Sequence, residues 1–135
     1  MTGIILEMHD KNGKKYRFEY AGTKNYHPNL SSTSGYGSDE WMFLCYDAEN
    51  KYILKFEASG ACGYAWAAVR IPPTIFDELA MNRGEDIFEV FYSYSMNKEY
   101  AIYALHPDSI ELAKQLVGSE YSRMGKMTDK DFYGY

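Results

Sequence analysis

The chain has 135 residues, of which 46% are hydrophobic and 24% charged, a composition that fits one folded domain and excludes a disordered chain. Nineteen acidic against fourteen basic side chains give a formal net charge of −5. This balance argues against binding to a phosphate backbone, which depends on clusters of Lys and Arg, and it favours a basic partner.

The first predicted element is a hairpin within residues 4–20, where apolar and polar residues alternate on both sides of an Asn-Gly pair. A three-residue loop, 11–13, with Gly13 in the left-handed conformation, pairs Met8 with Tyr16 and keeps the apolar residues on one face. A two-residue turn would put charged side chains on that face, so we expect the longer loop.

The segment 21–39 follows as a long irregular connection that contains Pro28, Gly35 and Gly37. Connections of this length without regular structure are usually functional or mobile. We therefore expect a binding loop here.

A second hairpin is predicted between strands 41–47 and 52–58. An even-numbered loop, 48–51, pairs Asp47 with Tyr52 and brings the apolar faces of the two strands together. Residues 64–71 predict a further strand, although the alanines at their centre also suit a helix.

Residues 73–83 predict a helix, with Pro73 in its first turn and Gly84 as its stop. The alternation of Phe88, Val90, Tyr92 and Tyr94 predicts a long strand instead.

A two-residue turn at 97–98 pairs this long strand with residues 101–105 in a third hairpin. A second helix is predicted to begin at Asp108 or Ser109 and to end at Gly118.

The expected fold class is therefore α+β, with a six- or seven-stranded, mainly antiparallel sheet of three β-hairpins and two short helices on one face. Residues 1–118 are expected to form this single domain. Residues 119–135 are expected to form a tyrosine-bearing C-terminal tail or docking arm.

The strongest candidate for catalysis is Cys62, which follows a glycine-containing turn, with His106 as its base. No family signature surrounds this cysteine, and a small buried or turn cysteine explains it as well. The carboxylate pairs at 39–40, 77–78 and 85–86 are interpreted as solvated or helix-capping charges. We therefore expect no enzymatic activity.

The three histidines are scattered, and the two cysteines lack zinc spacing, so we expect no metal site and no cofactor. Two unclustered cysteines also suit a reducing compartment. No stretch approaches the length of a membrane span, and the apolar run after Met1 is too short for a signal peptide. We expect a cytoplasmic protein, in the host cell if a phage encodes it.

Fourteen tyrosines are present, and those in the segment 21–39 and after residue 118 have no packing role that the pattern assigns. Aromatic side chains among Ser, Gly and Asn are typical of binding loops, because they bury area at low entropic cost. The expected partner-binding residues are Tyr26, His27, Tyr36, Asp39, Glu40, Tyr121, Tyr133 and Tyr135.

The sequence thus favours a non-enzymatic, acidic protein-binding module. Its size and charge suggest an inhibitor of a basic nucleic-acid-handling protein, of the immunity or phage counter-defence (anti-CRISPR) kind, with no direct nucleic-acid contact. A homodimer through an edge strand stays open. The alternatives are a small-molecule or carbohydrate-binding domain with Trp41 and Trp66 in its pocket, and a small hydrolase that uses Cys62 and His106.

Overall fold

The computed structural model describes residues 3–27, 40–57, 66–97, 99–100, 102–108, 111 and 116. Its strands are β1 (Ile5–His9), β2 (Lys15–His27), β3 (Glu40–Tyr46), β4 (Lys51–Glu57), β5 (Trp66–Ile71) and β6 (Ile102–Pro107). Helices α1 (Pro73–Met81) and α2 (Ile87–Ser95) come between β5 and β6. The predicted α+β class with mainly antiparallel strands is confirmed.

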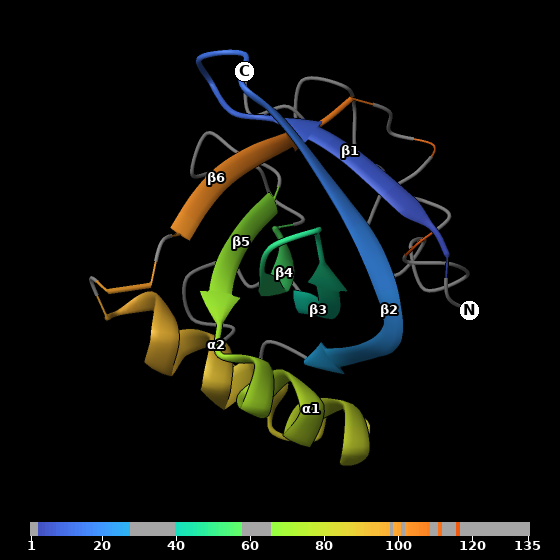
Figure 1. The fold of residues 1–135 in the computed structure, drawn as a ribbon, viewed down its shortest axis with the longest axis vertical. Coiled ribbons are helices and arrows are strands. Elements are labelled where there is room, and N and C mark those ends of the chain that lie inside the picture. The colour runs from blue at the N-terminus through green and yellow to red at the C-terminus, as the bar shows by residue number, and fades with distance from the viewer. Residues whose placement is uncertain are drawn as a thin grey trace, which may run out of the picture.

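The six strands close into an antiparallel barrel in chain order, and both helices lie together against its outside (Figure 1). Closure was not predicted. Because the described strands form a ring, no whole strand is left as an edge.

One hydrophobic core fills the inside of the barrel, because alternate residues of each strand point inward. Phe43 is fully buried there, with its ring 5.8 Å from that of Trp66 and 6.2 Å from that of Trp41. The buried members of this core are Leu6, Met8, Phe18, Tyr20, Trp41, Phe43, Cys45, Tyr52, Leu54, Phe56, Trp66, Ala68, Leu105 and Leu116.

A second core lies between the outer faces of β3, β4 and β5 and the helices. Its buried members are Met42, Leu44, Ile53, Ala67, Val69, Ile71, Phe76, Leu79, Ile87 and Phe91. The strands under the helices are therefore apolar on both faces, while β1 and β2 carry charged residues on their outer face.

The first hairpin is confirmed in register and loop. Met8 pairs with Tyr16, the amide of Gly13 donates to the carbonyl of Asp10 at 3.0 Å, and Gly13 has φ +84°. Only a residue that tolerates this left-handed conformation closes the three-residue loop without strain.

The second hairpin is confirmed, but its predicted register is wrong by two residues, because Tyr46 pairs with Lys51 and Cys45 with Tyr52. The reason is Asp47, which belongs to the turn and not to the strand. One of its carboxylate oxygens accepts the amides of Glu49 and Asn50 at 2.8 and 2.7 Å. A shift of two residues keeps the same faces inward, so the predicted core residues are still correct.

The predicted irregular segment 21–39 is wrong over 21–27, where β2 continues to His27. The pairing of β2 with β3 shifts between Tyr20 and Lys24, and Gly22 has φ +92° there. This bulge bends β2 so that one long strand serves both sides of the barrel. Residues 28–39 lie outside the described residues.

The strand at 64–71 is confirmed over Trp66–Ile71, and the helix at 73–83 is confirmed as α1 with Pro73 in its first turn. The predicted strand at 88–94 and the third hairpin are wrong, because Ile87–Ser95 is the helix α2.

Periodicity did not separate the two structures at this place. Aromatic residues alternate there, but Ile87 and Phe91 also stand four residues apart, and both are buried against the barrel. The amide of Val90 donates to the carbonyl of Asp86 at 3.0 Å, which starts the helix. Tertiary packing thus decided the conformation.

In the region of the predicted second helix, Glu111 and Leu116 are helical, and the other residues from Ser109 to Gly118 lie outside the described residues. Leu116 is buried in the barrel core, and the Lys24 ammonium donates to its carbonyl at 3.3 Å. The tail 119–135 also lies outside the described residues.

The barrel closes between β1 and β6 with only two residue pairs, Met8 with Pro107 and His9 with His106. Asp108 reinforces this short seam. Its amide donates to the carbonyl of Glu7 at 3.0 Å, and its carboxylate lies 2.6 Å from His9 Nδ1 and 3.2 Å from Lys15 Nζ. Burial alone would raise the pKa of Asp108, but the hydrogen bonds from His9 and Lys15 outweigh it and hold the pKa below its ordinary value.

We expect Asp108→Asn to lower the free energy of unfolding at pH 7 by about 1 kcal/mol, because it weakens contacts across the seam that are partly exposed. The folded-state pKa of Asp108 is depressed, so its contribution is present above about pH 4 and is lost as the pH falls further. Urea unfolding should show a larger difference from the wild type at pH 7 than at pH 3. The control is Asp77→Asn, and equal stability of both variants at pH 7 would contradict the role of Asp108.

Candidate functional site

The two helices form a hairpin whose turn is fixed by one side chain. The Asn82 side-chain oxygen accepts the amides of Gly84 and Glu85 at 3.1 and 3.2 Å, and its nitrogen donates to Asp86 at 3.2 Å. Arg83 and Gly84 both have positive φ, 62° and 75°, which turns the chain sharply between the helices.

This turn is also held against the barrel. The Asn25 side chain on β2 donates to the carbonyl of Gly84 at 2.8 Å. A Cβ atom at Gly84 would stand 3.2 Å from the Thr23 methyl group, so glycine suits both the conformation and the close approach. The helix pair is therefore a preformed part of the structure.

A buried cation on the barrel contacts the inner face of the helix pair. Lys55 on β4 is only 7% exposed, and its ammonium donates to the Tyr92 hydroxyl at 3.1 Å. The ammonium also lies 5.3 Å from the Phe91 ring centre and 5.2 Å from the Tyr92 ring centre. The charge of this lysine thus stabilises the contact between β4 and α2.

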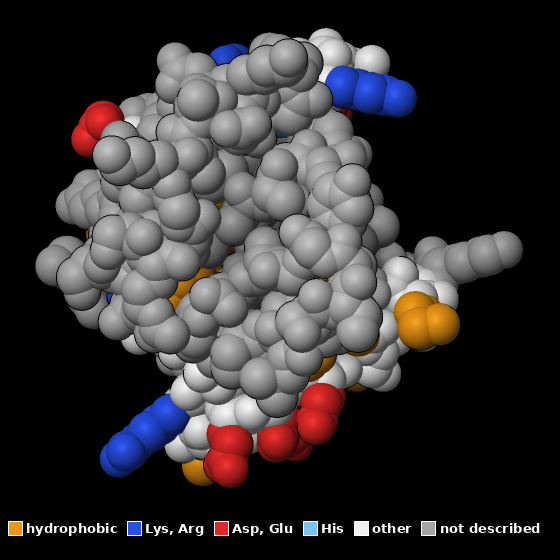
Figure 2. Space-filling model, turned by 180° about the vertical axis from the view of Figure 1, so that it is seen from behind, with side chains coloured by type: hydrophobic (Ala, Val, Ile, Leu, Met, Phe, Trp, Pro, Cys, Tyr) orange, Lys and Arg blue, Asp and Glu red, His pale blue; other side chains and the backbone are white. Residues whose placement is uncertain are grey.

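The outer face of the helix pair is acidic. Its exposed carboxylates are Asp77, Glu78, Glu85, Asp86 and Glu89. Arg83 is the one basic residue between Pro73 and Asn97, so this segment carries a net charge of −4 out of −5 for the chain. In Figure 2 the acidic side chains gather along the helix-bearing edge, with hydrophobic side chains at its margins.

Most of these carboxylates are not neutralised. The side-chain carboxylates of Asp77, Glu78, Glu85 and Glu89 form no ion pair or hydrogen bond with the described part of the chain. The Asp86 carboxylate accepts from Asn82 only. The charge of this face therefore points into solvent.

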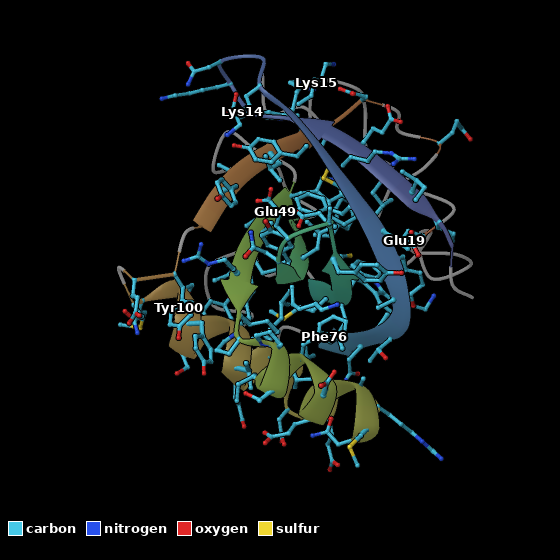
Figure 3. All side chains as sticks on the ribbon, in the orientation of Figure 1. Lys14, Lys15, Glu19, Glu49, Phe76 and Tyr100 are labelled. Atoms are coloured by element: carbon cyan, nitrogen blue, oxygen red, sulfur yellow. The ribbon has the colours of Figure 1, made fainter. Side chains whose placement is uncertain are left out.

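Lysines on the barrel differ from these solvent-facing carboxylates, because most of the described ones contact an aromatic ring or a carboxylate. Lys51 Nζ lies 4.7 Å from the Tyr46 ring centre and 5.0 Å from that of Phe76. Lys14 lies 5.2 Å from the Tyr16 ring centre, and Lys15 pairs with Asp108. Figure 3 shows Lys14 and Lys15 at the end of the molecule opposite to Phe76 of α1. These two cations therefore lie away from the acidic helix pair.

Two large apolar side chains accompany the acidic face. Met81 ends α1 and Met96 follows α2, and each is 85% exposed. Flexible methionine side chains adapt to irregular partner surfaces and are common at protein-binding sites. Acidic charge and exposed methionine thus occur on the same helix pair.

The structure brings three of the predicted partner-binding residues together. Tyr26 and His27 end β2, Glu40 starts β3, and His27 pairs with Glu40 in the sheet. Glu40 pairs in turn with Glu57 on β4, so the ends of these strands lie at one end of the barrel. The other predicted residues, Tyr36, Asp39, Tyr121, Tyr133 and Tyr135, lie outside the described residues.

Of the catalytic candidates, His106 lies in β6, is only 4% exposed and has its ring 5.7 Å from that of His9. Cys62 lies outside the described residues. Cys45 is fully buried, which raises the pKa of its thiol and keeps it protonated.

The tryptophans expected to line a ligand pocket are core residues instead. Trp41 is 6% exposed and Trp66 is fully buried inside the barrel. Both rings belong to the hydrophobic core inside the barrel.

Among the described residues no three His, Cys, Asp or Glu side chains come together as a set of metal ligands. Neither helix in the described ranges has the length and apolar character needed to cross a membrane. Comparisons with protein-family models, curated proteins and solved structures find no match.

Sequence reasoning missed the acidic helix face, because residues 88–94 were assigned to a strand. A strand places neighbouring residues on opposite faces, which separates Glu89 from the other carboxylates. The spacing of Ile87 and Phe91, directly after the polar run 82–86, was the signal that favours a helix hairpin.

Proposed function

We propose that this chain is a non-enzymatic protein-binding module whose acidic helix pair, α1 and α2, docks on a basic surface of a partner protein. The observation that carries the proposal is the concentration of four of the five net negative charges on 25 of the chain's residues, Pro73–Asn97. A compact acidic face of this kind attracts a basic partner over long range and raises the rate of encounter.

The local structure supports docking with little rearrangement. The Asn82 turn and the bond from Asn25 to Gly84 hold the helices in place before any partner arrives. A surface that is already ordered loses less conformational entropy on binding. Met81 and Met96 add apolar contact area beside the carboxylates.

The partner class that fits best is a protein that handles nucleic acid. Such proteins present clusters of Lys and Arg that bind phosphates, and a rigid row of carboxylates competes for the same cations. The biological role would then be inhibition, of the immunity or phage counter-defence kind. The chain itself would not contact nucleic acid, since its net charge is −5.

The test is capture of partners by the tagged protein from a nuclease-treated lysate of its native host or target cell. The variant Glu78→Lys/Glu85→Lys reverses two charges on the helix pair, and the control Glu7→Lys/Glu49→Lys reverses two exposed charges on the barrel. We expect a basic protein to be captured in stoichiometric amount by the wild type and the control, and to be lost with the helix variant.

Both variants have the same net charge, so a loss confined to the helix variant reports the place of the charge and not its total. Thermal unfolding of each variant shows that the fold is kept. Capture of the same partner by all three proteins, or of none, would contradict docking through the helix pair.

A further inference from the structure

A groove of about 400 Å³ opens between β2 and the turn that joins β3 to β4. It exists because β2 pairs with β3 only from Glu19 onward, where Glu19 faces Tyr46 and β3 ends. The earlier residues of β2 pair with β1 alone and face the turn across a gap. The groove is therefore a consequence of the strand lengths.

Arg17 is the cation of this groove. Within the described part of the chain its guanidinium forms no hydrogen bond or ion pair, not even with Glu7, its cross-strand neighbour on β1. A guanidinium carries five N–H donors in a planar fork that matches a carboxylate. None of the described residues occupies the donors of Arg17, which suits it to bind a carboxylate.

The two carboxylates of the groove are held in place by tyrosine hydroxyl groups. Glu19 accepts a hydrogen bond from the Tyr46 hydroxyl, and Asp47 accepts one from the Tyr52 hydroxyl at 2.9 Å. Burial would raise the pKa of Asp47, but its hydrogen bonds from two backbone amides and Tyr52 hold the pKa below its ordinary value.

The walls between these charges are partly apolar. Ile5 and Ala48 line the groove together with Tyr46, which contacts Glu19 through its hydroxyl and Phe76 through its ring. The volume falls in the range of small-ligand sites. The described lining residues thus supply one unpaired cation, two fixed anions and an apolar wall, so the groove repels a simple anion and suits a ligand with both charges.

We propose that this groove binds a small zwitterion with an apolar side chain, namely a free α-amino acid such as phenylalanine. Its carboxylate pairs with Arg17, its ammonium faces Glu19 and Asp47, and its side chain lies against Ile5 and Ala48. This site is separate from the helix pair and does not depend on the proposed function.

The test is titration of the ¹⁵N-labelled full chain with L-phenylalanine, followed by NMR amide shifts. Matched titrations use 3-phenylpropionate, which lacks the ammonium, and phenethylamine, which lacks the carboxylate. We expect saturable shifts at Arg17, Glu19 and Ala48 with phenylalanine, and at least about tenfold weaker binding of both analogues. No saturable shift, or equal binding of the three compounds, would overturn the proposal.

Variants provide a second readout. Arg17→Gln should weaken phenylalanine binding about tenfold or more, and Ala48→Trp should abolish it by filling the groove. Lys11→Gln, which removes an exposed charge from the hairpin tip outside the groove, should bind like the wild type. Unchanged binding by Arg17→Gln, with the wild-type NMR spectrum otherwise kept, would place the ligand elsewhere and refute the site.

Discussion

Phe43→Ala is expected to lower the free energy of unfolding by about 3–5 kcal/mol. The Phe43 ring is fully buried at the centre of the barrel and packs on Trp41, Trp66 and Tyr20 with ring centres 5.8–6.2 Å apart. The closed ring of strands cannot collapse into the space that the substitution leaves, so the cavity adds to the loss of buried area. Urea unfolding followed by tryptophan fluorescence measures the effect.

The control for this prediction is Met81→Ala, which removes a large side chain that is 85% exposed and should change stability by less than about 0.5 kcal/mol. A difference between the two variants of less than about 1 kcal/mol would show that Phe43 does not lie in the core.

The second large effect is expected in association kinetics with the captured partner. The association rate constant of the wild type should fall steeply as salt is raised, because steering by exposed charges is screened at physiological ionic strength. At low salt the association rate constant of Glu78→Lys/Glu85→Lys should be lower than that of the wild type by a factor of about ten or more, and it should depend less steeply on salt. Stopped-flow or surface-based kinetics between 50 mM and 500 mM NaCl would measure both.

The barrel variant Glu7→Lys/Glu49→Lys, with equal net charge, should keep most of the wild-type rate and salt slope. Equal losses in both variants would mean that only the overall charge of the chain matters. Such a result would leave the helix pair without a special role.

Local patterns predicted the elements that local chemistry determines. Gly13 in its left-handed turn determines the first hairpin, and Pro73 with Gly84 bounds α1. In the second hairpin the local pattern was not sufficient to predict the register. Its alternation was correct, but a carboxylate that caps the turn at Asp47 moved the register by two residues.

Contacts between distant residues could not be predicted. Barrel closure depends on β1 meeting β6 across almost the whole chain and on a bulge at Gly22 in β2. The conformation of residues 87–95 was ambiguous because aromatic residues there fit both a period of two and a helix. Burial of Ile87 and Phe91 against β5 decided for the helix.

For the candidate site, the sequence predicted only the excess of acidic residues and not their position. The sequence gives net charge −5, but which carboxylates share a face follows from the helix hairpin. The sequence prediction placed recognition at the loop and tail tyrosines. Of those residues, Tyr26 and His27 lie at the end of β2 and Glu40 at the start of β3, directly after the residues Thr23 and Asn25 that contact Gly84 in the turn between α1 and α2.

The most direct test of the docking surface is therefore hydrogen–deuterium exchange of the chain, free and bound to its captured partner. We expect protection on binding to be concentrated in residues 73–97, with the largest change in the turn from Asn82 to Asp86. Protection confined to the ends of β2 and β3 around His27 and Glu40, with 73–97 unchanged, would contradict docking through the acidic helix pair.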